Sequence, residues 1–465
     1  MKKYLCLICM GLMSFGIASA QQTGEVLTLS INEAIELALS DNPTVKVANL
    51  EIERYDYVRK QALASLYPSV DVSGQYSLAI RRQEMAQGFS FGGKNTFNVS
   101  GSVALPLFVP AIYEQLKMTR TQMESAVESA RATRIDMVAS VRSAYYNVLL
   151  AEQSLEVLKE AIKTTEEVVE NTKKLYENGL ASEYDYLTAE VQLSNLKPQV
   201  LQTENAIGLT KLQLKMYLSI PEGVDIAVVG TLDDFRDKVL LNEEFSYDIA
   251  DNTTVRNLDI QEQMLKHQER LIQSSRMPSI AAFGQISYIG QERVDLSGLM
   301  GGGAASGQGN AESMSAVITR AAASEQSKFW WQAPISVGAQ ISIPIFAGFN
   351  KTNQLREVRN QMSQLNMQRE YAEQGVRLQI EQAINTLLTA RETMLSNELT
   401  VQQAQKAYNI SLTRYNAGAG TILELNSSQL SLTQAQLSYS QSIYDYLSAY
   451  ASYEKTLGKE YSAEE

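Results

Sequence analysis

The longest uninterrupted segment of the chain most constrains its fold. From Ala111 to Asn178, 68 consecutive residues contain neither glycine nor proline, and strong helix formers predominate. A continuous helix of this length would extend about 100 Å at ~1.5 Å per residue. A second such segment runs from Asn350 to Ala417, interrupted only by Gly375. Because no ordinary globular core can cover helices this long, the sequence predicts an elongated architecture in which helices pack on one another.

Apolar residues recur along the first segment at the spacing of one helix face, which indicates a stripe that packs on neighbouring helices. The recurring positions include Ile135, Val138, Val141, Tyr145 and Val148. A glycine-containing turn and a further helical segment follow each long segment, and we expect Pro198 to kink the first of these. The expected helices lie at about 110–176, 184–217, 350–415 and 422–457.

Residues 1–20 have the features of a secretory signal peptide. A basic start is followed by an apolar run and by the small residues Ala18-Ser19-Ala20. We expect cleavage before Gln21, which would leave a mature chain without cysteine, because Cys6 and Cys9 both lie in the leader. Such a chain can form neither a disulfide nor a thiolate metal site.

Charge and the scarcity of reactive side chains exclude several functions. The chain has 52 acidic and 40 basic residues, a formal net charge of −12, which argues against nucleic acid as a partner. His267 is the single histidine. A histidine-rich metal centre is therefore excluded, and Ser-His-Asp or Cys-His catalysis is disfavoured. We expect neither an enzyme nor a bound cofactor.

Four segments alternate apolar and polar residues with period two, as strands with one apolar face do. They lie at about 69–80, 97–108, 279–290 and 330–346, and Phe283 interrupts the polar side of the third. Their length suits a tilted strand that crosses an outer-membrane bilayer, and strands of a soluble sandwich with one wet face are the alternative.

The positions of aromatic residues also bear on a membrane. Aromatic residues that suit a membrane interface lie near the ends of these segments, at Tyr76, Tyr288, Trp330 and Trp331. After residue 20 there is no run of about 18 apolar residues, so a membrane-spanning helix is not expected.

The chain contains an internal repeat. Pro68-Ser69-Val70 returns 210 positions later as Pro278-Ser279-Ile280, and Leu105-Pro106-Leu107-Phe108 returns 238 positions later as Ile343-Pro344-Ile345-Phe346. Ordered matches of this kind indicate duplication. We expect a first repeat at 21–217, an inter-repeat segment at 218–250, a second repeat at 251–458 with a long loop at 291–329, and a tail at 459–465.

Membrane strands must close into a barrel, because open sheet edges are not tolerated in lipid. Four strands are too few, since the practical minimum is about eight. The chain must therefore oligomerise; a dimer would supply eight strands and a trimer twelve, and the alternation does not choose between them.

Taken together, these features resemble the TolC-like outer-membrane efflux protein family. The resemblance covers essentially the whole mature chain. Its most specific pieces are the Leu-Pro-Leu-Phe and Ile-Pro-Ile-Phe segments and the turn Tyr415-Asn416-Ala417-Gly418. It implies a mainly α-helical homotrimer with a twelve-stranded transmembrane β-barrel, four strands per chain, in outer-membrane lipid. A long α-helical barrel would continue it into the periplasm.

The resemblance also implies partners, namely a periplasmic adaptor (membrane fusion) protein and an inner-membrane pump of RND, ABC or MFS type. The turns 176–187 and 415–426 would form the periplasmic tips, where the adaptor docks. The residues matched to docking are Gly179, Leu180, Gly418 and Ala419. Pro106 and Pro344 would mark the junctions from strand to helix, since proline lacks the donor that a ladder requires.

At the entrance, Tyr415 matches a tyrosine of the family's closed-state network, and Asp185 and Glu424 match acids near the opening. Repeated threefold, these acids could form a carboxylate ring that favours cations. Alternatively, each acid stabilises its own helix N-terminus by about 0.3–1 kcal/mol. Gly420 stands where the best-known gate has a basic residue, and Ser427 where it has a second acid, so the closed-state contacts must differ.

The leading hypothesis is a passive trimeric exit duct for small molecules, metal ions or polypeptides. A structural coiled-coil protein of the periplasm or surface, without transport activity, is the alternative. It explains the helices but not the four amphipathic strands. A secreted enzyme is disfavoured by the missing cysteine, the single histidine and the lack of a phosphate-binding loop.

Overall fold

The computed structural model describes residues 26–80, 83–85, 89–91, 94–241, 245–292 and 329–462. The expected signal peptide 1–20 lies outside the described residues, as does most of the expected loop 291–329. The chain divides into two units. We call the described parts of 1–50, 128–256 and 371–465 the core unit, and those of 51–127 and 257–370 the strand unit. Among the described residues, no helix is both long and apolar enough to cross a membrane.

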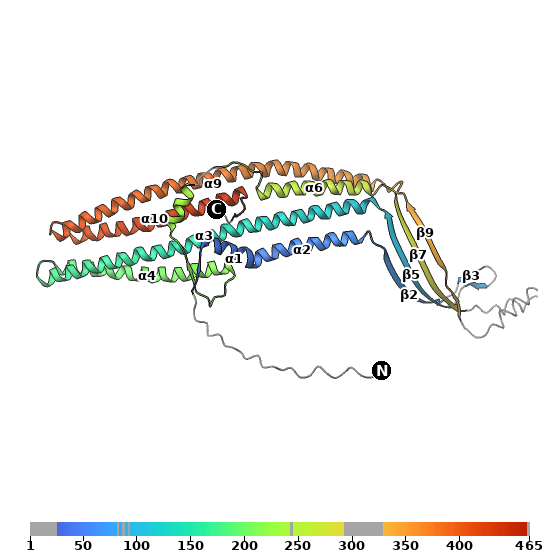
Figure 1. Cartoon of the computed structure of the whole chain (residues 1–465), viewed down its shortest axis with the longest axis horizontal. Helices are drawn as coiled ribbons and strands as arrows, with labels where there is room; N and C mark the ends of the chain where they lie inside the picture. Colours follow the sequence, from blue (N-terminus) through green and yellow to red (C-terminus); the bar gives the residue numbers. More distant parts are fainter. Residues whose placement is uncertain are drawn as a thin grey trace, which may run out of the picture. The chain divides into compact units, whose positions relative to one another are not determined.

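The described chain is mainly helical (Figure 1). Its four longest helices are α3 (Pro110–Glu177), α4 (Glu183–Leu218), α9 (Asn350–Asn416) and α10 (Ile422–Leu457). Pro110 is the first residue of α3, where its missing N–H and fixed φ suit a helix start. α4 continues through Pro198, where a kink is expected.

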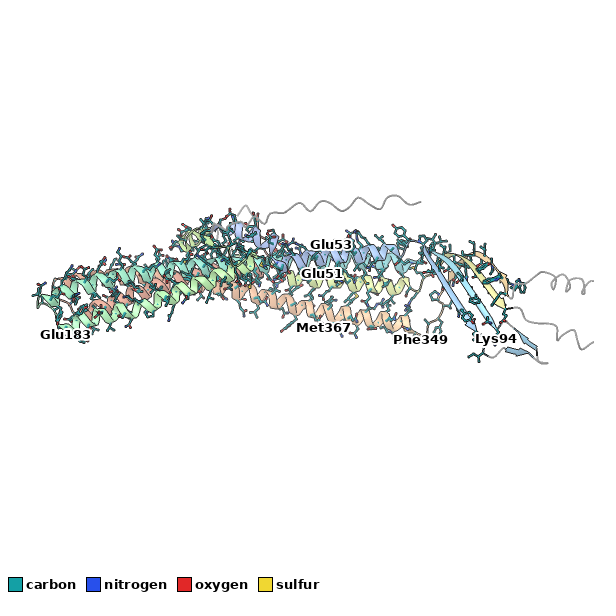
Figure 2. The ribbon with its side chains drawn as sticks, turned by 90° about the horizontal axis from the view of Figure 1, so that it is seen from below. Glu51, Glu53, Lys94, Glu183, Phe349 and Met367 are labelled. Atoms are coloured by element: carbon teal, nitrogen blue, oxygen red, sulfur yellow. The ribbon has the colours of Figure 1, made fainter. Side chains whose placement is uncertain are left out.

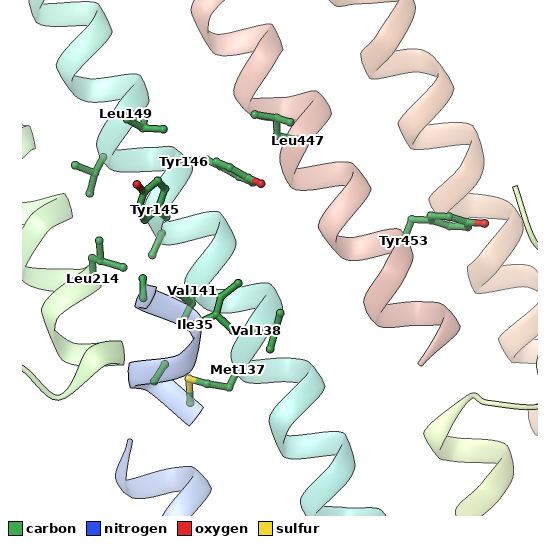
Figure 3. Packing of buried hydrophobic residues seen from close by; sticks show 14 of the residues in the cluster. Ile35, Met137, Val138, Val141, Tyr145, Tyr146, Leu149, Leu214, Leu447 and Tyr453 are labelled. Atoms are coloured by element: carbon green, nitrogen blue, oxygen red, sulfur yellow. The ribbon is translucent and has the colours of Figure 1, made fainter. Parts of the chain in front are cut away.

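The buried core of the core unit gathers around the middle of α3. Apolar residues of α3 pack there on α1 (Ile31–Asp41), α4, α9 and α10. In Figure 3, Tyr146 points from α3 toward Leu447 of α10, whereas Tyr145 lies on the side of Leu214 of α4. Tyr145 and Leu214 are fully buried. Full burial of a large apolar side chain contributes about 1.5–3 kcal/mol, so this cluster anchors the unit.

Two three-residue strands, β1 (Leu27–Leu29) and β6 (Ile226–Val228), pair in parallel, which the sequence did not predict. The hydroxyl of Tyr145 joins them, because it lies 2.9 Å from the carbonyl oxygen of Leu29 and accepts from the N–H of Val229 at 2.9 Å. Burial raises the pKa of Tyr145 to about 12, so this hydroxyl keeps its proton at neutral pH.

Two further tyrosine hydroxyls, both on α10, hold the inter-repeat segment to the helices. Tyr439 donates to Oδ1 of Asp233 at 3.2 Å, in α5 (Leu232–Leu241). Tyr453 accepts from the backbone N–H of Ser246 at 2.6 Å. These tyrosines of α10 therefore combine packing between helices with polar anchoring.

Two buried asparagines make matching contacts in the core unit. Asn42 precedes α2 (Pro43–Ala64), and its Nδ2 donates to the carbonyl oxygen of Tyr217 at 2.8 Å. Asn252 precedes α6 (Thr253–Ser274), and its Nδ2 donates to the carbonyl oxygen of Thr456 at 2.7 Å. Each asparagine thus caps one helix and satisfies a carbonyl group in the last turn of another.

A buried arginine fixes the end of α10. Arg131 of α3 pairs with Glu128 at 2.8 Å, and both side chains are 9% exposed. Its guanidinium also donates to the carbonyl oxygens of Gly458 at 2.9 Å and of Asp251 at 2.5 Å. These bonds join three chain segments that are far apart in the sequence.

The strand unit contains a five-stranded sheet of β2 (Ser69–Leu78), β5 (Asn95–Phe108), β7 (Ser279–Glu292), β8 (Phe329–Gln332) and β9 (Ile335–Ser342). Neighbouring strands run antiparallel, and β2, β5, β7 and β9 lie side by side in that order (Figure 1). The short strand β8 also pairs with β7. The expected strand 330–346 is therefore divided at Pro334, which cannot donate to a ladder. A separate short pair, β3 (Gln83–Met85) and β4 (Phe89–Phe91), lies between β2 and β5 in the chain.

Candidate functional site

The register of the sheet gives it one apolar and one polar face. Side chains of paired residues point to the same face, and the faces alternate along each strand. One face carries apolar sets such as Val70, Val103 and Val337, with Gly284 between them. The next set along, on the other face, is Asp71, Ser102, Gln285 and Ser336. The alternation found in the sequence is thus in phase across the paired strands as far as Pro106, where the register of β5 against β7 shifts.

Aromatic rings lie together at one end of the apolar face. Tyr76 contacts Phe97 with ring centroids 4.8 Å apart, and Tyr288 stacks on Trp331 at 4.9 Å. Gly290 makes room for the second pair, because a Cβ there would lie 2.5 Å from the ring of Trp331. Trp331 and Tyr288 remain exposed, as side chains at a membrane interface would be in a single chain.

The two proline junctions differ from each other. Pro106 lies inside β5 opposite Ala281, and the register shifts between Pro106 and Phe108. It therefore marks an irregularity within the strand and not its end. Pro344 lies in the connection between β9 and α9, where Gly348 and Phe349 adopt positive φ. Phe349 is labelled at this connection in Figure 2.

The two turns expected at the tips share one backbone structure. In residues 178–182, the first turn, Gly179 has φ 72° and the N–H of Leu180 donates to the carbonyl oxygen of Leu175 at 2.8 Å. In residues 417–421, the second turn, Gly418 has φ 72° and the N–H of Ala419 donates to the carbonyl oxygen of Arg414 at 2.9 Å. Both are Schellman motifs, in which glycine takes the left-handed position without strain.

Each of the two turns exposes an apolar residue. Leu180 is 77% exposed, and Ala419 is exposed as well. Glu183 marks the start of α4 beside the first turn in Figure 2.

The two acids expected at the entrance make different contacts. Asp185 completes a capping box, because its Oδ2 accepts from the N–H of Ser182 at 3.1 Å and from its hydroxyl at 2.7 Å. Glu424 donates its N–H to Oγ1 of Thr421 at 3.2 Å, while its carboxylate lies 3.8 Å from Nη1 of Arg414. The sequence did not single out Arg414, although a basic residue in a last helical turn is a recognisable feature.

Tyr415 ties the second turn to α3. Its hydroxyl forms a 2.8 Å hydrogen bond with the hydroxyl of Thr172, and its ring borders a small apolar cluster near the turns. Gln429 of α10 also donates to Oγ1 of Thr165 at 2.7 Å, and both groups are buried. Burial raises the pKa of Tyr408, which belongs to the same cluster. These contacts join α3 to α9 and α10 within one chain.

The described residues of the two turns contribute acidic, basic and phenolic side chains. No three histidine, cysteine, aspartate or glutamate side chains come together there to hold an ion. Asp185, Glu424 and Tyr415 all lie near the two turns, whereas Pro106 and Pro344 belong to the strand unit.

A family model described as outer membrane efflux protein matches residues 34–218 and 302–459, which is more than half of the chain. The chain belongs to the outer membrane efflux protein family. TtgC of Pseudomonas putida, a probable efflux pump outer membrane protein, is 24% identical over 210 residues. This alignment covers 44% of the chain and 43% of TtgC, so the chain spans less than half of that relative.

Other members of the efflux protein family match over most of their length. The outer membrane protein TolC of Vibrio cholerae is 20% identical over 454 residues, 96% of this chain and 93% of that protein. The crystal structure of VceC, also from Vibrio cholerae, superimposes with a TM-score of 0.67 at 17% identity and covers 92% of this chain and 96% of VceC. The chain therefore has the fold of the TolC-like channels.

Proposed function

We propose that three copies of this chain form a passive exit duct through the outer membrane. The two-faced sheet carries this proposal. Its apolar face suits lipid and its polar face suits a water-filled lumen. Among the described strands, β2 pairs only with β5, and β8 and β9 pair only with β7. Neighbouring copies would pair these edges, and three copies would close the twelve-stranded barrel that the family resemblance implies.

Exposed apolar residues on α4 support contact between copies. They recur at helical spacing on a side of the helix away from its buried residues Ala189, Leu196 and Leu214. The exposed residues of this α4 stripe are Tyr184, Leu187, Val191, Leu201, Leu209, Leu212 and Met216. We infer that a neighbouring copy covers the stripe in the helical barrel. The two similar halves of each chain, 21–217 and 251–458, would then give the wall a sixfold-like arrangement.

The entrance would lie at the two turns, with Gly179, Leu180, Gly418 and Ala419 available to a periplasmic adaptor protein. An inner-membrane pump of RND, ABC or MFS type would supply the cargo and the energy. Opening would be a change at the tips that the adaptor favours through contacts made only in the open state. TtgC of a second Pseudomonas putida strain is named a toluene efflux pump protein, which favours small molecules as cargo. Polypeptides are the second candidate, because another relative is named an alkaline protease secretion protein.

Extraction and conductance test the proposal. The mature protein is expected in the membrane fraction, solubilised only by detergent, with the mass of three chains by light scattering. In planar bilayers it is expected to conduct ions. Recovery as a monomer without detergent would overturn the channel and favour the structural coiled-coil alternative, as would a trimer that never conducts.

A pair of variants tests the α4 stripe. Val191→Glu combined with Leu212→Glu places charges on the stripe and is expected to shift the trimer toward monomer on native gels. Lys197→Glu is the matched control, because it introduces the same charge at an exposed position of the same helix. A trimer equally stable in both variants would show that another surface joins the copies.

A further inference from the structure

Phe283 of β7 interrupts the polar face of the sheet. It precedes Gly284, which belongs to the apolar face, so the side chain of Phe283 points to the opposite, polar side. Its partners in the register are Ala104 of β5 and Gly338 of β9. The next row on this face consists of Asp71, Ser102, Gln285 and Ser336. An aromatic ring, 40% exposed, therefore lies beside a polar row on the face that suits water.

Small neighbours surround this ring. A Cβ added to Gly338 would lie 2.9 Å from Cζ and 3.1 Å from Cε1 of Phe283, so the outer part of the ring lies over the glycine backbone. Ala104 pairs on the other side, and Ala281 precedes Phe283 by two residues on the same face. We call Ala104, Ala281, Phe283 and Gly338 the Phe283 patch. Because its other members are small, the ring is left partly uncovered.

The position of the Phe283 patch limits what can cover the ring. An aromatic ring can shield a glycine of an edge strand, and Phe283 does this for Gly338 of β9. That role does not use the exposed part of the ring. β7 pairs with β5 on one side and with β9 on the other, whereas β2 and β9 each pair with a single strand. Copies that join at β2 and β9 would leave the patch open, so a molecule in the lumen is what would contact it.

We propose that the Phe283 patch is a binding site in the lumen for aromatic molecules that carry hydrogen-bonding groups. This inference rests on the proposed function, which places the polar face in the lumen. The exposed ring offers stacked or edge contacts to another aromatic ring. The polar row that contains Gln285 lies about 7 Å farther along the strands, two residues at ~3.3 Å each. One small molecule can therefore contact the ring and an amide or a hydroxyl group together.

Such a site is expected to be weak, and weak binding suits a duct. Cargo must bind well enough to enter and loosely enough to leave. One half-exposed ring with small neighbours provides a contact surface but no enclosed cavity. Three copies would present three Phe283 rings at one level of the lumen. The patch would therefore favour the passage of aromatic cargo over that of equally polar cargo without a ring.

Planar bilayers that contain the purified full-length protein test this site. Phenyl β-glucoside and methyl β-glucoside carry the same sugar and differ in the aromatic ring. The measurement is the glucoside concentration that gives half of the maximal reduction in conductance. In the wild type, phenyl glucoside is expected to act at a concentration on the order of fivefold lower than methyl glucoside. Phe283→Leu is expected to remove most of this difference, whereas Phe283→Tyr keeps the ring and is expected to retain it.

Phe97→Leu is the matched control. Phe97 is 39% exposed, close to the 40% of Phe283, but it pairs with Tyr76 and Gly290 on the apolar face of the same sheet. The substitution removes an equally exposed ring from the side that would face lipid, so the difference between the two glucosides is expected to persist. Circular dichroism and native gels check that each variant folds and assembles.

The results separate failure of this inference from failure of the duct. If the wild type conducts but both glucosides act at the same concentration, the Phe283 patch does not bind aromatic molecules. If Phe283→Leu keeps the difference, or if Phe97→Leu removes it equally, Phe283 only covers Gly338. In both cases the duct stands. If the trimeric wild type does not conduct, the proposed function itself is wrong and the binding site falls with it.

Discussion

The first hairpin, α3 with α4, and the second hairpin, α9 with α10, have the same turn backbone. Their side-chain contacts at the start of the second helix differ. Both turn through a left-handed glycine at φ 72° with the same backbone hydrogen bonds. At the start of the second helix, however, Asp185 caps its own helix while Glu424 faces Arg414. The backbone of a turn can thus be kept while its charge is changed, because the Schellman bonds use no side-chain groups.

The C-terminal ends of α4 and α10 also share a left-handed backbone conformation but differ in their contacts. Ser219, with φ 57°, caps the C-terminus of α4, and Gly458, with φ 77°, caps that of α10. The end of α10 is held by Arg131 and lies close to the carbonyl group of Asp251. Polar contacts therefore hold the C-terminal end of α10, and substitutions there are expected to have the largest effects on the free energy of unfolding.

The largest expected effect is the loss of the Arg131 guanidinium. Arg131→Met leaves Glu128 buried without its nearest cation, which is expected to lower the free energy of unfolding by about 3–5 kcal/mol. Denaturant unfolding in detergent, followed by circular dichroism, measures the change. Arg120→Met, on an exposed pair of the same helix, is the control and is expected to cost less than about 1 kcal/mol.

Adding Glu128→Leu to Arg131→Met provides a second check. It removes the unpaired carboxylate and should restore part of the lost stability. If the double variant were no more stable than Arg131→Met, the cost would come from the carbonyl groups of Gly458 and Asp251 and not from the buried charge.

The next effect is expected at Gly458. A Cβ there would lie 2.2 Å from the carbonyl oxygen of Asp251, and the residue has positive φ. Gly458→Ala is therefore expected to destabilise the protein by roughly 2–4 kcal/mol through strain and backbone overlap. Gly418→Ala shares the positive φ but has open space around it, so about 1 kcal/mol is expected. Equal losses would show that conformation, not the contact with Asp251, decides the cost.

Much of this fold can be predicted from sequence, because glycine and proline punctuate it. α4 and α10 begin and end within one residue of the expected 184–217 and 422–457. Period-two alternation also predicted the two faces of the sheet, since side-chain direction follows directly from the strand repeat. Local rules suffice where a segment is long and its periodicity is strong.

The remaining features depend on contacts that no local pattern contains. β1 and β6 have three residues each, too few for a periodic signal. Arg131 and Gly458 are 327 positions apart in the chain, and nothing in the sequence pairs them. Asp185 and Glu424 are both acids at equivalent positions of the two halves, so the sequence predicted the same role for both. Only their side-chain directions distinguish the capping box of Asp185 from the ion pair of Glu424.

A smaller effect should distinguish Asp185 from Glu424 by the local stability of their helix starts. Asp185→Ala removes the acceptor for the N–H and the hydroxyl of Ser182, so a loss of about 1 kcal/mol is expected at the start of α4. Glu424→Ala removes only an exposed ion pair and is expected to cost about 0.5 kcal/mol or less. Hydrogen exchange of the amides in the first turn of each helix measures both losses. Equal protection in the two variants would contradict the difference between the hairpins.

The smallest expected effect is a gain in stability. Ser219 adopts the left-handed conformation at the end of α4, a position that Gly458 holds at the end of α10. Ser219→Gly removes the penalty of a Cβ at positive φ, although it also makes the unfolded chain more flexible. A net stabilisation of about 0.5 kcal/mol is expected, measured as a higher denaturation midpoint with an unchanged slope. A loss would mean that the serine contributes a contact that offsets its strain, and the two hairpin ends would then differ in side-chain bonding as well as in conformation.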